Sequence, residues 1–166
     1  MDFPKFQRLV EERSGFRTME SPTASGEYFS DSCGDMYNFF LKVGPGAVIE
    51  DISYFTTGCG FGTATCSLVV DLAKGKTIDE AASIMPADIE AQLEGYPEKK
   101  KDYPERALEA LQVALDDYRG KVTGGSIPDY AAMPRRETPK PQPVAPSAAS
   151  ANGQGDDAAK VLIKLR

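Results

Sequence analysis

Two cysteines, Cys33 and Cys59, lie in sequence settings that suit metal or sulfur chemistry. Cys33 is followed by a glycine and then by Asp35, and Cys59 lies between two glycines in the segment GCGFG. Glycines let the backbone approach a ligand closely, and thiolates bind soft metals and iron–sulfur clusters. The chain has three cysteines and no histidine, which excludes imidazole ligands, His-based acid–base chemistry and Cys–His nucleophiles.

The elements around Cys33 and Cys59 predict that the two thiols meet in space. Residues 36–43 and 47–57 favour strands, and a Gly-Pro-Gly segment lies between them. We expect an antiparallel hairpin whose open end brings both cysteines to one edge of the sheet. A helix predicted over residues 62–74 follows Cys59, and its N-terminal N–H groups would stabilise a thiolate there. These features favour a functional thiol pair over the usual state of a free cysteine, a small buried apolar residue.

The rest of the pattern predicts an α+β fold in which a small antiparallel β-sheet packs with helices. Residues 15–32 are rich in Ser, Gly and Thr, so we expect a loop there. Thr77 followed by Glu80 predicts a capping box at the start of a short helix. The further predicted helices, from apolar spacing and proline positions, cover residues 3–14, 86–93 and 104–119.

The composition limits the function classes. The chain has 166 residues and a net charge of −6, which argues against sequence-independent nucleic-acid binding. No run of 18 apolar residues exists, so we expect no membrane span. The first residues lack the pattern of a secretory signal, and we expect a cytoplasmic protein.

A change in composition predicts the domain boundary. Residues 1–121 are expected to form the folded domain, and residues 122–155 a disordered linker rich in Pro, Ala and Ser. The last residues, 156–166, combine apolar and basic side chains. Short apolar segments after linkers dock in grooves or on sheet edges, so this end could recruit a partner; the alternative is a disordered end without one.

Three segments together resemble the IscU/NifU N-terminal family of iron–sulfur cluster assembly scaffolds. They are SCGD at 32–35, GCGFGTATCSLVVDLAKGKTIDEA at 58–81 and ALQVALDDYRGK at 110–121, and the resemblance covers about residues 3–121. It implies an α+β fold and a scaffold that is not an enzyme. It also implies assembly of a [2Fe–2S] cluster on three cysteines, with sulfur from a cysteine desulfurase and delivery to recipient apo-proteins.

The resemblance also implies residue roles. Cys33 and Cys59 match the first two cluster cysteines of the family, and Asp35 matches an aspartate that assists cluster release. The chain departs from the family at the third cysteine and its neighbouring histidine. An ungapped count back from the last long helix places Asp102 at the histidine and Tyr103 at the cysteine.

Several groups could complete the ligand set. Cys66 lies two helical turns after Cys59, although it shares a stripe with apolar residues, as a buried core cysteine does. Asp102 could bind a metal beside two thiolates, or it could act as a solvated helix cap. Tyr103 is the least favoured ligand. A cluster held between two chains of a homodimer would receive four thiolates from Cys33 and Cys59 alone.

Three functions therefore compete. The favoured one is an iron–sulfur scaffold or carrier that binds iron or a labile [2Fe–2S] cluster through Cys33, Cys59 and a further ligand. The second is a non-enzymatic adaptor of the same fold that holds zinc or no metal. The third is a dithiol redox or persulfide carrier. Beside the site, Lys99, Lys100 and Lys101 form a basic run that could dock an acidic partner or be a solvated loop.

Overall fold

The computed structural model describes residues 1–31 and 34–124 of the chain. Cys33, residues 125–155 of the predicted linker and the terminal segment 156–166 lie outside the described residues. The elements follow in the order α1 (Phe3–Glu12), β1 (Ala24–Ser30), β2 (Asp35–Gly44), the short 3₁₀ helix η1 (Pro45–Ala47), β3 (Val48–Thr56), α2 (Gly60–Ala73), α3 (Ile78–Ala82), α4 (Pro86–Gln92), a second 3₁₀ helix η2 (Glu98–Lys100) and α5 (Tyr103–Thr123). This arrangement confirms the predicted α+β class.

The strands form an antiparallel sheet in the order β1-β2-β3. In the middle strand, Tyr37 pairs with Tyr28 of β1 on one side and with Thr56 of β3 on the other. The predicted hairpin is confirmed as β2 and β3. Its turn passes through η1, where Gly46 has a φ of 71°, a backbone conformation that favours glycine.

The first strand corrects the sequence prediction, because residues 15–32 are not a loop throughout. Residues 24–30 form β1, and Gly26 within it shows why the pattern was misleading. A Cβ atom on Gly26 would lie only 2.2 Å from the backbone nitrogen of Ala114 in α5. The strand therefore needs a glycine to pack against the helix, and that glycine weakens its β signal.

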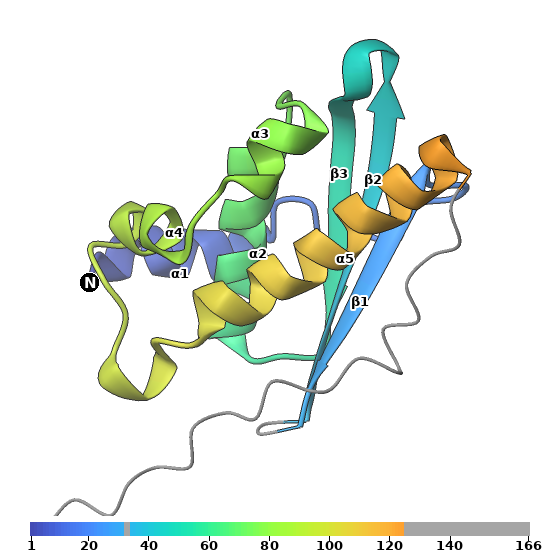
Figure 1. The fold of residues 1–166 in the computed structure, drawn as a ribbon. Helices are drawn as coiled ribbons and strands as arrows, with labels where there is room; N and C mark the ends of the chain where they lie inside the picture. The colour runs from blue at the N-terminus through green and yellow to red at the C-terminus, as the bar shows by residue number, and fades with distance from the viewer. Residues whose placement is uncertain (32–33, 125–166) are drawn as a thin grey trace, which may run out of the picture. The chain divides into compact units, whose positions relative to one another are not determined.

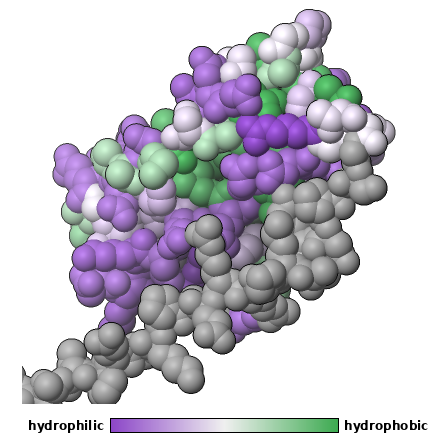
Figure 2. Space-filling model, in the orientation of Figure 1, coloured by the Kyte–Doolittle hydropathy of each residue, from purple (hydrophilic) through white to green (hydrophobic). Residues whose placement is uncertain are grey.

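The helices pack against the sheet around one apolar core (Figure 1). Helix α5 contacts β1 and β2, and α2 contacts β3, α1, α4 and α5. The largest wholly buried side chains come from β2, β3, α4 with the residue after it, and α5: Tyr37, Phe39, Leu41, Ile49, Ile52, Tyr54, Ile89, Leu93, Leu111 and Leu115. In the space-filling view, hydrophilic residues cover much of the described surface, and hydrophobic surface shows mainly between the elements (Figure 2).

The helix ends follow the sequence signals closely. Thr77 and Glu80 form the predicted capping box, with the Thr77 side chain accepting from the Glu80 N–H at 3.2 Å. Helix α2 begins at Gly60, two residues earlier than predicted, so that Cys59 itself is the N-cap. Helix α5 begins at Tyr103 and continues to Thr123. Within residues 1–31 and 34–124, no helix combines the length and apolar character needed to cross a membrane.

Candidate functional site

Cys59 is an exposed thiol at the N-terminus of α2. The N-terminal ends of α2 and α5 lie side by side (Figure 1). The GCG sequence positions the cysteine because β3 ends at Thr56 and the helix begins only four residues later, at Gly60. The chain thus presents a thiol where a helix offers unpaired N–H groups and the positive end of its dipole.

Tyr103 and Lys100 complete the surroundings of this thiol. The Cys59 Sγ lies 3.3 Å from the Tyr103 hydroxyl oxygen. The Lys100 ammonium donates to the same hydroxyl at 3.1 Å and also lies 4.9 Å from the centre of the Tyr103 ring. The family resemblance places Tyr103 at the third cluster cysteine, and thus in this neighbourhood, as the least favoured ligand. The sequence does not predict the hydrogen bond itself, because 44 residues separate the cysteine from the tyrosine.

These neighbours lower the pKa of the Cys59 thiol below its ordinary value. Partial burial raises this pKa, but the opposing effects are larger in sum. They are the hydrogen bond with Tyr103, the backbone N–H groups of Phe61 and Gly62, and the charge of Lys100. The site therefore favours the thiolate, which is the form that binds metals and attacks electrophiles.

Asp35, at the start of β2, lies beside the loop that carries Cys59. A Cβ atom on Gly58 would be 3.4 Å from the Asp35 Oδ2. Two hydrogen bonds join the strand start to the loop: the Thr57 N–H donates to the Met36 carbonyl at 3.2 Å, and the Met36 N–H donates to the Thr57 Oγ1 at 3.0 Å. The hairpin thus places the Asp35 carboxylate beside Gly58, the residue that precedes Cys59. The predicted approach of Cys33 to Cys59 involves a residue outside the described ones and stays a prediction.

Cys66 lies in a very different place on the same helix. Its side chain is wholly buried in the core, and burial raises the pKa of the Cys66 thiol. Residues Gly62 to Val70 of α2 are all buried, so the middle of this helix has no open side on which a thiol could meet solvent. This confirms the interpretation of Cys66 as a buried core cysteine, which the apolar stripe on the helix favours, and the alternative of Cys66 as a ligand beside Cys59 is wrong.

Asp102 precedes α5 and pairs with a cation. Its carboxylate forms an ion pair with Arg106 one turn along the helix, and its side chain makes no capping hydrogen bond. Among the neighbouring lysines, Lys101 pairs with Glu98 at 2.6 Å while Lys100 turns to Tyr103. Within residues 1–31 and 34–124, no three Cys, Asp or Glu side chains gather as a metal site.

A comparison with protein families decides the relationship of this chain to known proteins. The model described as "NifU-like N terminal domain" matches residues 9–124. The chain belongs to this family. The match spans all the strands and α2 to α5, and thus the hairpin, Cys59 and Tyr103.

Relatives of this NifU-like domain carry a consistent name. The chain is 37% identical over 116 residues to the iron-sulfur cluster assembly scaffold protein IscU of Aquifex aeolicus (strain VF5), across 67% of this chain and 74% of that protein. It is 36% identical over 106 residues to the protein of the same name in Escherichia coli (strain K12), across 64% of this chain and 82% of that protein.

Solved structures support the fold of the NifU-like domain independently. A NifU-like protein (N-terminal) from Brucella abortus superposes with a TM-score of 0.55 at 17% identity, covering 70% of this chain and 93% of that one. A putative scaffold protein for the SUF system from Fervidobacterium islandicum AW-1 gives a TM-score of 0.56 at 19% identity, covering 67% and 93%. At these identities the likeness concerns the fold alone.

Proposed function

We propose that this NifU-like domain is an iron–sulfur cluster assembly scaffold or carrier, with no catalytic activity of its own. It holds iron or a labile [2Fe–2S] cluster as cargo through Cys33 and Cys59. The observation that carries the proposal is the exposed Cys59 thiol at a helix N-terminus, with a lowered pKa and with Asp35 beside the preceding residue, Gly58. The relatives named as cluster assembly scaffolds support the same function.

The donor set suits this cargo. Thiolates are the ordinary ligands of iron–sulfur clusters. A thiol with a lowered pKa releases its proton to solvent more readily when iron binds. The carboxylate of Asp35 is a harder ligand than sulfur and would hold cluster iron weakly. A carboxylate beside a thiolate therefore fits a site that must both bind its cargo and release it.

The proposed ligand set excludes two residues that the sequence raised. Cys66 is wholly buried, and Asp102 is paired with Arg106. Two thiolates from each chain leave a cluster short of its usual four, so we propose that two chains share one cluster. The partners would be a cysteine desulfurase and recipient apo-proteins in the cytoplasm. The terminal peptide at 156–166 would recruit a further partner.

Anaerobic reconstitution of the full chain with ferrous iron and sulfide tests this function. The wild-type protein should develop visible absorbance, and chemical analysis should find equal iron and sulfide at one cluster per two chains. Light scattering should give the mass of a dimer. Cys59→Ala and Cys33→Ala should each remove the colour, and Cys66→Ala, the matched control, should keep it. Colourless wild-type protein would contradict the function. Colour that survives in Cys59→Ala would contradict the ligand assignment.

A further inference from the structure

Lys100 determines the direction of the hydrogen bond between Cys59 and Tyr103. The ammonium of Lys100 can only donate, so the Tyr103 oxygen accepts from it at 3.1 Å. The O–H hydrogen of the phenol takes no part in that bond, and the Cys59 Sγ lies 3.3 Å from the hydroxyl oxygen. A thiolate at Cys59 can only accept. In the charged form of the site, the tyrosine therefore donates to the sulfur.

The phenol is held firmly in this position. Tyr103 is 4% exposed, and its ring packs 6.1 Å from the ring of Phe61. The Lys100 ammonium and the Arg106 guanidinium lie 4.9 and 5.2 Å from the centre of the ring. Arg106 is in turn anchored by its ion pair with Asp102. Ring packing and two cations thus fix the hydroxyl before any cargo arrives, which is what a positioning group requires.

We propose that Tyr103 is a positioning residue that donates a hydrogen bond to the Cys59 sulfur and so sets the strength with which this sulfur binds iron, with Lys100 holding the phenol. A hydrogen bond draws electron density from a thiolate. The sulfur then donates less to iron, which raises the reduction potential of a bound cluster. The inference rests on the proposed function for the loaded state only, because the contact itself exists without cargo.

The first test uses the protein without cargo and measures the reactivity of Cys59. In a Cys33→Ser background, Cys59 is the thiol open to iodoacetamide because Cys66 is buried. Tyr103→Phe should slow alkylation at pH 7. The reason is that a smaller fraction of Cys59 is then thiolate, and the higher nucleophilicity of the remaining thiolate offsets only part of that loss. Lys100→Met should slow it in the same direction.

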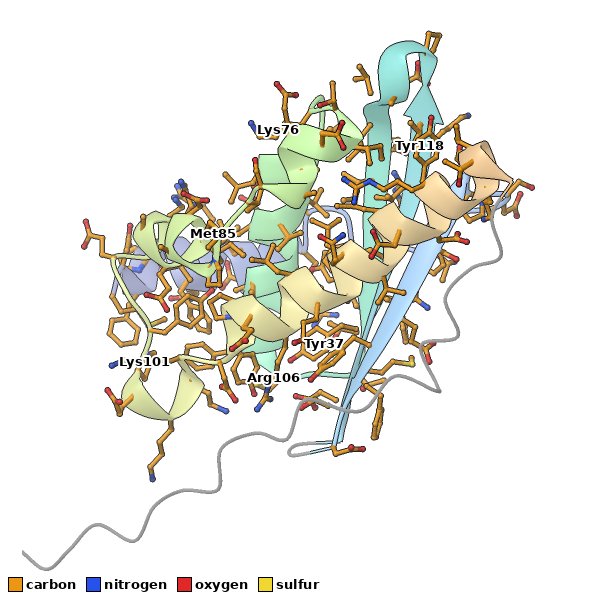
Figure 3. The ribbon with its side chains drawn as sticks, viewed as in Figure 1. Tyr37, Lys76, Met85, Lys101, Arg106 and Tyr118 are labelled. Atoms are coloured by element: carbon orange, nitrogen blue, oxygen red, sulfur yellow. The ribbon has the colours of Figure 1, made fainter. Side chains whose placement is uncertain are left out.

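Two matched controls accompany these variants. Tyr118→Phe removes a phenol near the other end of the same helix (Figure 3), and Lys99→Met removes the charge of the lysine next to Lys100 in η2, whereas the ammonium that donates to Tyr103 belongs to Lys100. Both should leave the alkylation rate unchanged. An unchanged rate in Tyr103→Phe, with the protein folded by circular dichroism, would overturn the inference. This result would leave the proposed function untouched.

The second test uses the reconstituted protein. Tyr103→Phe should still bind a cluster, and the reduction potential of that cluster should be more negative than in the wild type, with Tyr118→Phe as control. An equal potential would overturn the inference. Complete loss of the cluster from a folded Tyr103→Phe protein would also overturn it, because the tyrosine would then be a ligand. If the wild-type protein bound no cluster, the proposed function would be contradicted. The alkylation rates would still test the contact between Tyr103 and Cys59.

Discussion

Two regions of α2 hold thiols in opposite environments. At the start of the helix, Cys59 is exposed as the N-cap and its pKa is lowered. Seven residues later, Cys66 is wholly buried and its pKa is raised. The two positions share a residue type and helical spacing, but one end of the helix emerges from the core and its middle does not. What a cysteine can do here depends on that difference.

Replacing each cysteine with aspartate should sharpen the comparison most. Cys66→Asp buries an unpaired carboxylate, which should cost roughly 3–5 kcal/mol of a total stability of roughly 5–15 kcal/mol. Cys59→Asp places a favoured N-cap residue at a helix start, so the free energy of unfolding should stay within about 1 kcal/mol of the wild type. Urea unfolding measures both values, with the alanine variants as controls. Equal losses at the two positions would contradict the assigned environments.

Peptide-level mass spectrometry after brief alkylation should show the next largest effect. In the native protein, Cys59 should react at least ~100-fold faster than Cys66, because a buried thiol reacts only when the structure opens. In denaturing urea the two rates should converge. A native protein in which both thiols react at similar rates would show that the middle of α2 is open to solvent.

The pH dependence of Cys59 alkylation should give the smallest of the three effects. Because the folded environment lowers the pKa of this thiol, thiolate should persist to lower pH than in the unfolded chain. The midpoint of the rate profile in native protein should therefore lie below that of the same cysteine in urea. The lowered pKa also means that this thiol contributes stability above its unfolded pKa and loses it as the pH falls through the folded value.

A charge variant provides the control for that profile. Lys100→Met removes a cation that favours the thiolate, so it should move the native midpoint upward, toward the value in urea. Lys99→Met should not. Native and unfolded midpoints that coincide would show that the N-terminus of α2 does not stabilise the thiolate.

The same contrast explains which parts of the fold the sequence could predict. The hairpin of β2 and β3, the capping box at Thr77 and the helices depend on local signals, namely alternation, turn residues and apolar spacing. Strand β1 does not. Its Gly26 is required by the close approach of Ala110 and Ala114 in α5, and such a tertiary requirement leaves no local trace.

The features of the candidate site likewise include some that depend on local sequence and some that depend on tertiary packing. The hairpin ends and the helix start that hold Asp35 and Cys59 are local features that the sequence predicts, and the Asp35 carboxylate lies beside Gly58. The burial of Cys66 depends on the elements that surround α2, and the contact between Tyr103 and Cys59 depends on how α5 crosses the molecule. Periodicity within one segment indicates the burial of Cys66 through its apolar stripe, but it cannot report the contact between Tyr103 and Cys59.

Capture of the thiol pair by a trivalent arsenical tests the central claim most directly, since this reagent bridges two thiols only when they are close together. Native protein should bind one arsenical, and mass spectrometry of digested protein should find it linking Cys33 to Cys59. Cys66→Ser should bind it equally well, and Cys59→Ser should not. Native protein that forms no such bridge would contradict the paired-thiol site on which the proposed function depends.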